Sequence, residues 1–285
     1  MNSETQKKMS LPDTNGFKFS VAMCVYDGDD PRFFDEALNS VFDQTLPPDE
    51  VVLQVDGPIN GGLEEVVAKY ASRYDSFKVF RFERNRGHGV ARNECLSHCS
   101  YDYVAIADAD DVNRFDRFEK QIRHFRDNPG LSAVSSACYH FSESVDRVLN
   151  EEKLPLSDKE IKKYMKKRCP LCQASTMFRK SEVIRAGGYQ DWYHAEDYYL
   201  WIRMYLSGAT FENDEESLIY VRTTEDQSKR RGGIRYFRSL KKLFRYMRKN
   251  KVIGFYRYSV NVFSRFVIQV LLPNKVRAFL RKVFQ

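Results

Sequence analysis

The strongest constraint on the fold is an alternation of strand and helix patterns between residues 17 and 141. The apolar runs that fit strands lie at 19–26, 50–55, 78–82, 103–107 and 131–141. The stretches that fit helices open at Asp30-Pro31 and lie at 61–73, 90–99 and 114–127. They carry apolar residues at helical spacing, or a capping Asp followed by Pro. Alternation with short connections predicts an α/β fold, Rossmann-like, with a mostly parallel sheet and helices on both faces.

After residue 150 the regular alternation ends. We expect a basic helix within 155–168, a short strand at 174–179, a helical turn at 181–186 and a helix that opens near Glu196. Glu196 and Asp197 then lie in the first turn of that helix. Acidic residues there stabilise the helix dipole, which would be an ordinary structural role. The alternative is a general base at the mouth of an aromatic-lined pocket.

The strand at 103–107 runs directly into Asp108-Ala109-Asp110-Asp111. Three carboxylates this close repel one another, and hiding each one unpaired costs about several kcal/mol. Hard oxygen ligands favour a divalent metal, Mg²⁺ or Mn²⁺, that also carries phosphate oxygens. The alternative is that the run caps the helix at 114–127, which needs one or two of the acids. We favour the metal–phosphate site.

Other polar residues follow the remaining strands. Tyr26-Asp27, Asp56-Gly57 and the 83–89 loop all stand at strand carboxyl ends. Ligands of open α/β sheets bind beyond these ends, so we expect a nucleotide there, with Tyr26 beside it. The Asp56 carboxylate could accept hydrogen bonds from a base edge, or Asp56 could be a simple turn residue before Gly57.

A glycine-bearing loop, Asn85-Arg86-Gly87-His88-Gly89, opens the helix at 90–99. Its glycines allow close backbone approach, and a helix N-terminus favours anions. Arg86 and Arg92 could add contacts to a diphosphate. Glycine turns before helices are common, so the loop alone is weak evidence, and we assign His88 no role.

The net charge of +7 conceals two segments of opposite sign. Seventeen lysines and arginines and no acidic residue lie after residue 228, which leaves 29 basic and 39 acidic residues before it. The tail opens at Lys229-Arg230-Arg231, where Arg230 and Arg231 could lie over a diphosphate as a flap. Two apolar stripes at helical spacing follow, interrupted by Arg257 and Arg265, so a bilayer span is not expected. The tail either lies on an anionic membrane or packs on the catalytic body.

The N-terminal segment and the cysteines indicate an intracellular chain. Met1 to Gly16 is polar and lacks the apolar run of a signal peptide, so we expect a disordered N-terminus and a cytosolic protein. The six cysteines are then expected to be reduced. Cys169 and Cys172 have the spacing of half a zinc site, but no partner pair completes it. Most of the cysteines are expected to be small buried hydrophobes.

The joint order of these motifs resembles the family 2 glycosyltransferases, and more narrowly the bacterial enzymes of capsule, exopolysaccharide or lipopolysaccharide assembly. The motifs are Val55-Asp56-Gly57, Asn85-x-Gly87, Asp108-x-Asp110-Asp111, Gly187-Gly188-Tyr189 and Glu196-Asp197-x-x-Leu200-Trp201, after a strand at 19–26. The resemblance covers about residues 17–250. It implies a GT-A fold and an inverting transfer of a sugar from a nucleotide-sugar donor, such as a UDP-sugar, to a saccharide or lipid-linked acceptor.

The resemblance also implies roles for individual residues. Asp56 would read the uracil edge, Asp108 the ribose, and Asp110 would bind the divalent metal. Asp197 would be the catalytic base with Glu196 beside it. Cys172-Gln173-Ala174 departs from the Asn-His-Pro run of many relatives, on the acceptor side.

The expected organisation follows from these assignments. Residues 17–228 would form the catalytic domain, with a nucleotide half at 17–141 and an acceptor half at 142–228. Residues 229–285 would form a basic helical tail that faces the membrane, so that the protein is peripheral on the inner face of the cell membrane.

Three other functions fit the sequence less well than a glycosyltransferase. A sugar-phosphate nucleotidyltransferase would show a glycine-rich loop after its first strand, whereas this chain has Tyr26-Asp27-Gly28-Asp29-Asp30. A phosphatase with an Asp-x-Asp nucleophile would carry that motif on its first strand. A nucleic-acid binder could use the basic tail, but the acidic body would repel a phosphate backbone, so no nucleic-acid partner is expected.

Overall fold

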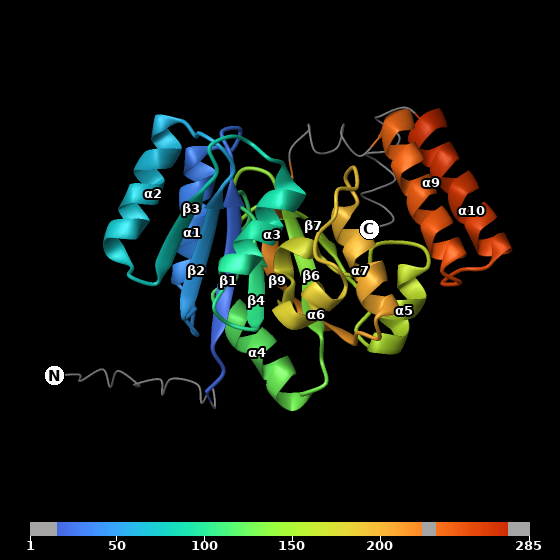
Figure 1. The fold of residues 1–285 in the computed structure, drawn as a ribbon, viewed down its shortest axis with the longest axis horizontal. Helices are drawn as coiled ribbons and strands as arrows, with labels where there is room; N and C mark the ends of the chain where they lie inside the picture. Colours follow the sequence, from blue (N-terminus) through green and yellow to red (C-terminus); the bar gives the residue numbers. More distant parts are fainter. Residues whose placement is uncertain (1–15, 224–231, 273–285) are drawn as a thin grey trace.

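The computed structural model describes residues 16–223 and 232–272 of the chain. Its first part follows the predicted alternation (Figure 1). The elements are β1 Phe19–Val25, α1 Pro31–Phe42, β2 Glu50–Val55, α2 Gly61–Arg73, β3 Phe77–Arg81, α3 His88–His98, β4 Tyr103–Ala107, β5 Val112–Asn113, α4 Arg117–Asp127 and β6 Ala133–Phe141. The strands and helices predicted for this region are therefore confirmed, with boundaries that move by one to three residues.

The second part adds two strands that the sequence did not suggest. Its elements are β7 Val148–Glu152, α5 Asp158–Met165, the 3-10 turn η1 Gln173–Ser175, β8 Met177–Arg179, α6 Lys180–Arg185, α7 Glu196–Leu206 and β9 Phe211–Arg222. The basic helix, the short strand and the helix opening at Glu196 are confirmed. Strands β7 and β9 were not predicted.

All nine strands belong to one sheet, in the order β3-β2-β1-β4-β8-β6-β9-β5, with β7 paired to β6. Strands β1 to β4 pair in parallel. Strand β8 is antiparallel to both β4 and β6, whereas β6 and β9 run in parallel. The predicted α/β architecture is confirmed, and the antiparallel strands enter where the regular alternation ends.

Two apolar cores cover the two faces of the sheet, which explains why most central strand positions are buried. On one face α1, α2 and α4 supply residues such as Phe34, Leu63 and Phe118. On the other face α3, α6 and α7 supply residues such as Leu96, Val183 and Trp201. This arrangement leaves the carboxyl ends of β1, β2 and β4 along one edge, where their loops meet.

The helix α4 corrects the capping alternative for the acidic run. Strand β5 lies between Asp111 and this helix and pairs with β9. Helix α4 begins only at Arg117, and the residue at its N-cap position is Asp116. The run at 108–111 is therefore not a helix cap, and the predicted start of the helix at 114 was three residues early.

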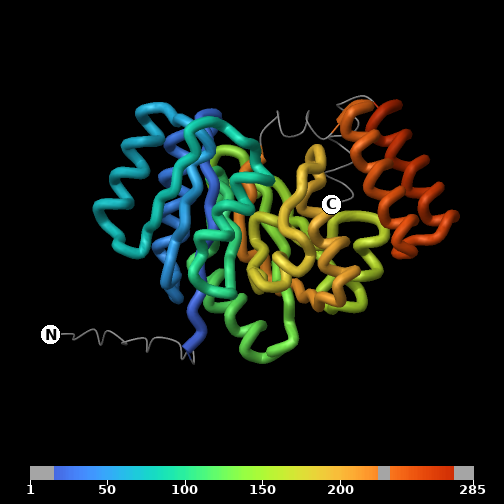
Figure 2. The backbone as a smooth tube through the Cα atoms, viewed as in Figure 1, coloured from blue at the N-terminus to red at the C-terminus, as the bar shows by residue number. Residues whose placement is uncertain are grey.

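The C-terminal helices α9 Gly233–Lys249 and α10 Phe255–Phe266 lie side by side at the end of the molecule opposite α2 (Figure 2). A π-helical turn, η2 Val267–Leu271, follows. The first predicted stripe, which includes Phe237, Leu240 and Met247, is buried against the catalytic body. The Trp192 Nε1–H group donates to the Ser239 carbonyl at 3.2 Å and fixes this contact. The predicted basic amphipathic helices are therefore confirmed, and α9 packs on the body.

No helix in the described ranges is both long and apolar enough to cross a membrane. The N-terminal residues 1–15, expected to be disordered, and the flap residues Arg230 and Arg231 lie outside the described residues.

Candidate active site

Asp56 organises the loop that follows β3. Its buried carboxylate accepts the backbone N–H of Arg86 at 2.7 Å and of Gly87 at 3.0 Å. The Asn85 side-chain amide donates to the Asp56 carbonyl at 3.2 Å. Four of the predicted nucleotide-binding residues are thus brought together at the end of β2. A carboxylate has about four acceptor positions, so Asp56 retains the capacity to accept further hydrogen bonds.

Gly57 allows this close approach. Its φ is +90°, and a Cβ there would lie 2.5 Å from the Asn85 nitrogen. Both the backbone conformation and the space require glycine. Tyr26 stands on the neighbouring strand end, 41 % exposed, with its backbone N–H donating to Asp29 at 3.0 Å. The aromatic face of Tyr26 is therefore accessible at the same sheet edge.

A buried arginine connects the glycine loop to the acidic run. The Arg92 Nη2 group donates to Asp108 Oδ1 at 2.6 Å, and its Nε–H group donates to His88 Nε2 at 2.7 Å. The other ring nitrogen of His88 lies 3.6 Å from Glu196 Oε1. Burial opposes ionisation of Glu196, but the bond to His88 and the charge of Arg92 outweigh it and lower its pKa. His88, to which we had assigned no role, is the link between these elements.

The carboxylates at the end of β4 gather with one more from the β1–α1 loop. Burial and the charges of Asp110 and Asp108 raise the pKa of Asp29 to about 7. Burial and the charge of Asp108 raise the pKa of Asp110 to about 6. Burial and the same neighbours raise the pKa of Asp111 well above its ordinary value. Asp29, Asp110 and Asp111 are therefore buried and close enough to neighbouring carboxylates for those charges to act on them.

The residues present fit a divalent cation. Asp29, Asp108, Asp110 and Asp111 offer only hard oxygen donors, which Mg²⁺ and Mn²⁺ prefer. Arg92 engages one of these side chains, Asp108. Burial is the main cause of the three raised pKa values, and repulsion adds to it; a bound cation would offset both.

Arg222, the last residue of β9, donates hydrogen bonds to two residues of the acidic run. Its backbone N–H donates to Asp111 Oδ1 at 2.8 Å, and its Nε–H group donates to the Asp110 carbonyl at 2.9 Å. Its buried guanidinium lies over the rings of Phe33, at 3.8 Å, and Phe141, at 4.4 Å. It also pairs with Glu36. This arginine therefore fixes the main chain of the acidic run.

Asp197 lies one residue into α7, beside Glu196. Its Oδ1 accepts the N–H of Tyr198 at 2.6 Å, and the Cys169 thiol lies 3.8 Å from its Oδ2. Tyr189, buried between α6 and α7, stacks under Arg92 with the guanidinium 5.5 Å from its ring. Of the two carboxylates at the start of α7, Glu196 is thus linked to Asp108 of the acidic run through His88 and Arg92, whereas the contacts of Asp197 are with Tyr198 and Cys169.

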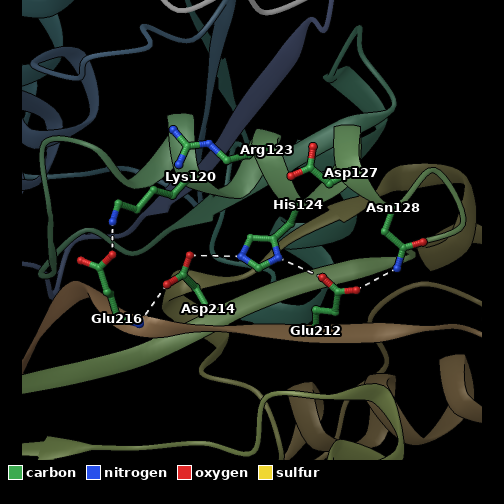
Figure 3. A pocket seen from close by; sticks show the side chains of 8 residues that line it. All are labelled: Lys120, Arg123, His124, Asp127, Asn128, Glu212, Asp214 and Glu216. Carbon is green, nitrogen blue, oxygen red and sulfur yellow. Dashed lines mark hydrogen bonds and ion pairs between the residues drawn. The ribbon is translucent and has the colours of Figure 1, made fainter.

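A cavity of about 370 Å³ lies elsewhere, between α4 and the first half of β9 (Figure 3). His124 bridges its two sides, with Nδ1 at 2.9 Å from Glu212 and Nε2 at 3.1 Å from Asp214. The residues that line this cavity are not at the strand ends that carry the predicted site residues, so it is not the candidate reaction centre.

The sequence of residues 20–188, more than half of the chain, matches the family model for glycosyl transferase family 2. The chain belongs to this family. Curated relatives agree over nearly the full length of both partners. One is the UDP-Gal:alpha-D-GlcNAc-diphosphoundecaprenol beta-1,3-galactosyltransferase of Escherichia coli, 35 % identical over 93 % of this chain and 95 % of the relative. Another is an amylovoran biosynthesis glycosyltransferase of Erwinia amylovora, 34 % identical over 92 % and 97 %.

Solved structures share the fold of this family 2 glycosyltransferase. Staphylococcus aureus TarS 1–349 in complex with UDP-GlcNAc matches with a TM-score of 0.65 at 18 % identity, over 88 % of this chain and 73 % of that one. The mannosyltransferase of Pyrobaculum calidifontis in complex with GDP-Man and Mn²⁺ gives 0.62 at 16 %, over 92 % and 72 %. GT-A glycosyltransferases commonly use a divalent metal. The predicted fold, family and enzyme class are confirmed.

Asp29, His88 and Arg222 are the residues of this glycosyltransferase site that the sequence analysis missed. Asp29 belongs to the acidic Tyr26–Asp30 run, and its place beyond β1, the neighbour of β4, was the available signal. Arg222 is the last residue of a strand that was not predicted, so no local signal existed.

Proposed function

We propose that this glycosyltransferase transfers a sugar from a UDP-sugar to a lipid-linked saccharide, with inversion at the anomeric carbon. The observation that carries the proposal is that Arg92 and His88 connect Asp108, in the acidic run, to Glu196 at the start of α7, next to Asp197. The acidic run suits a metal-bound diphosphate, and the carboxylates at the start of α7 suit the acceptor. The choice of UDP and of a lipid-linked acceptor draws on the galactosyltransferase relative, whose name states both.

The donor would lie along the sheet edge. Asp56 would accept from the base, Tyr26 would contact the nucleoside, and Asp108 would hold the ribose. Asn85, Arg86 and Gly87 would shape the same wall, since Asp56 already holds them together. Arg92 Nη1 has no hydrogen-bond partner among the described residues, so it is a donor available to the diphosphate. Arg230 and Arg231 would close over that group.

Asp110, with Asp29 and Asp108 nearby, would hold Mn²⁺ or Mg²⁺. Such a cation, when bound, offsets the charge that builds on the departing nucleoside diphosphate. The Asp197 carboxylate takes the proton from the acceptor hydroxyl as its oxygen attacks the anomeric carbon. The bond from that carbon to the diphosphate oxygen breaks in the same displacement, and its electron pair leaves with UDP. Glu196, held ionised by His88 and Arg92, orients the start of α7.

The acceptor lipid gives the C-terminal helices a role. On α10 the side chains of Phe255, Tyr256 and Phe263 are 67 %, 79 % and 70 % exposed. Together we call them the α10 apolar surface. It lies within a tail segment that carries basic residues and no acidic ones. Such a surface suits an anionic membrane on which a lipid-linked acceptor is presented.

The first experiment measures thermal stabilisation by UDP, GDP and dTDP, each with and without Mn²⁺. A ligand that binds only the folded state raises the melting temperature by mass action. We expect a shift with UDP that requires the metal and is lost in Asp110→Asn. A matched control is Asp146→Asn, which changes an exposed carboxylate in the β6–β7 connection that hydrogen-bonds to Ser144. The absence of any nucleotide shift in the wild type would contradict the donor site.

The second experiment tests the base. We expect Asp197→Asn to keep the metal-dependent UDP shift while the transfer rate falls by at least about a hundredfold, because a general base contributes about 10²–10⁴. Glu196→Gln serves as the comparison, and its rate should fall less. Normal turnover in Asp197→Asn would remove Asp197 from this role.

A further inference from the structure

Four side chains with metal-binding atoms meet where β6, β7 and the loop before η1 come together. Cys138 and His140 lie two residues apart on β6 and so share one face of the sheet. Glu152 on β7 is paired directly with Cys138. Cys172 packs against Cys138, and their two thiols interact by a hydrogen bond. The sequence analysis found only half of a zinc site here, because these residues come from three separate segments.

The distances match the edges of a tetrahedral zinc site. The Cys138 sulfur lies 3.7 Å from His140 Nε2, and the same nitrogen lies 3.2 Å from Glu152 Oε2. The three ligand atoms all lie within 4.8 Å of one another. Zinc bond lengths of about 2.3 Å to sulfur and 2.0–2.2 Å to nitrogen or oxygen, at tetrahedral angles, give separations of about 3.3–3.7 Å between unlike ligands and about 3.8 Å between two sulfurs. Cys138, His140 and Glu152 therefore need little movement to hold the ion, and Cys172, which packs against Cys138, would complete the set.

The surroundings of His140 also fit a ligand. Its second ring nitrogen, Nδ1, lies 3.3 Å from the Thr223 hydroxyl. A hydrogen bond at this nitrogen fixes the tautomer that leaves Nε2 free to bind a metal, as outer partners of zinc-binding histidines do. Cys138 is buried, whereas the His140 and Glu152 side chains are 16 % and 28 % exposed. A metal ion can therefore reach the cluster from one side.

We propose that Cys138, His140, Glu152 and Cys172 form a zinc site that is separate from the cation site at Asp110. Two thiols give up their protons to the solvent when the ion binds, and the ion then carries two thiolates, one imidazole and one carboxylate. Thiolate and imidazole ligands select Zn²⁺ over Mg²⁺ and Mn²⁺, which prefer oxygen. The two sites therefore take different metals.

The proposed zinc site would connect three segments in the second half of the fold. It joins β6 and β7 to the loop at 169–172, and Cys169 in this loop contacts Asp197. The zinc would thereby hold the loop against the proposed base. This consequence for catalysis rests on the proposed function, whereas metal binding itself does not.

The test uses the full-length protein, reduced and freed of metal, and titrates Co²⁺ as a spectroscopic substitute for zinc. We expect one equivalent to bind with thiolate-to-cobalt charge-transfer absorption and the ligand-field bands of a tetrahedral ion, and Zn²⁺ to displace it. Cys138→Ser and His140→Gln should remove or shift these bands. Thr223→Val, which leaves all four ligands in place, should weaken zinc binding by about 10–100-fold.

Two control variants distinguish metal binding at the proposed zinc site from metal binding elsewhere on the protein. His98→Gln changes a histidine that stacks on Phe80 outside the cluster and should bind as the wild type does. Asp110→Asn should lose the metal-dependent UDP shift and keep the cobalt spectrum, so the two proposals can fail independently. Three results would overturn the zinc site: no thiolate absorption in the reduced wild type, equal loss in His98→Gln and His140→Gln, or a Cys138–Cys172 disulfide that persists when zinc is present.

Discussion

At the scale of single residues, the site depends on close backbone approaches as much as on charged side chains. Gly57 shows this, because its missing side chain lets the β2 end and the 84–87 loop touch. The Asp56 carboxylate then caps two backbone N–H groups of that loop. The proposed nucleotide-binding wall is therefore shaped before any ligand arrives.

Replacing Gly57 with alanine should damage this wall. The added Cβ would stand 2.5 Å from a backbone nitrogen at a φ of +90°, so the loop has to move. We expect the free energy of unfolding to fall by about 1–3 kcal/mol, in the range of strained backbone positions, and the UDP shift to disappear. Denaturant unfolding measures the first effect and thermal stabilisation the second.

Gly61→Ala is the matched control. A Cβ at Gly61 meets nothing within 4 Å, and the residue opens α2. Alanine there should leave stability unchanged or raise it by about 0.4–1 kcal/mol. If Gly57→Ala and Gly61→Ala had the same free energy of unfolding and the same UDP shift, the close contact at Gly57 would have no effect on either property.

Some residues of the candidate site could be predicted from the sequence, and others could not. Asp56, Asn85, Asp108 and Asp110 follow strands whose apolar runs are plain in the sequence, so topology alone placed them at one edge. Arg222 comes 111 residues after the carboxylate that its N–H binds. No sequence pattern around Asp111 or Arg222 predicts that contact, because it depends on where β9 lies in the sheet.

At the scale of elements, β9 explains why the second half of the fold was hard to predict. The residues Asn213-Asp214-Glu215-Glu216 in its first half have low strand propensity. The strand forms because it pairs along β6 and because cations on α4 and just before it neutralise its acids. Lys120 contacts Glu216, and His124 lies between Glu212 and Asp214 (Figure 3). Arg114, which precedes α4, also contacts Glu216.

This contact predicts a pH dependence of stability. Hydrogen bonds to Asp214 and Glu212 raise the pKa of His124 despite its burial. Burial acts to raise the pKa of Asp214, but the hydrogen bond to His124 outweighs burial and lowers that pKa. The His124 contribution is complete below the ordinary histidine pKa of about 6.5 and is lost as pH rises through the raised value. The Asp214 contribution is present above the ordinary aspartate pKa of 3.8 and is lost as pH falls through the lowered value.

His124→Gln should therefore lower the free energy of unfolding by about 1–3 kcal/mol between about pH 4 and pH 6.5. The difference from the wild type should shrink at higher pH. Denaturant unfolding at several pH values measures it. Arg123→Gln on the same helix removes an exposed pair with Glu119 and should cost at most about 0.5 kcal/mol at any pH. A difference that is constant from pH 5 to pH 9 would exclude the charged state of His124 as its cause.

At the scale of the whole molecule, the two C-terminal helices of the basic segment have different structural roles. The helix α9 carries a buried stripe and belongs to the core, whereas α10 turns aromatic residues outward. The sequence predicted both stripes correctly. It could not say which one the body covers, because both have the same spacing and similar residues.

The α10 apolar surface gives a prediction for membrane binding. We expect the protein to float with anionic vesicles and much less with neutral ones. The variant with serine at 255, 256 and 263 should bind more than about tenfold less, because each large apolar side chain contributes on the order of 1 kcal/mol or more. Ile184→Ser with Leu206→Ser removes exposed apolar residues from the body and should bind normally. Equal flotation of both variants would argue against this surface.

The position of Arg222 has a consequence for how the protein is made. The acidic run leaves the ribosome long before β9, since synthesis proceeds from the N-terminus. Until Arg222 arrives, Asp111 lacks the N–H that it binds in the finished structure, and the edge of β6 that β9 covers stays open. The strands β1 to β4 can assemble during synthesis, but the carboxylate site is completed only by one of the last strands to emerge. A nascent chain that stops before β9 would therefore carry every acid of the proposed metal site and still lack the Arg222 contacts to Asp110 and Asp111.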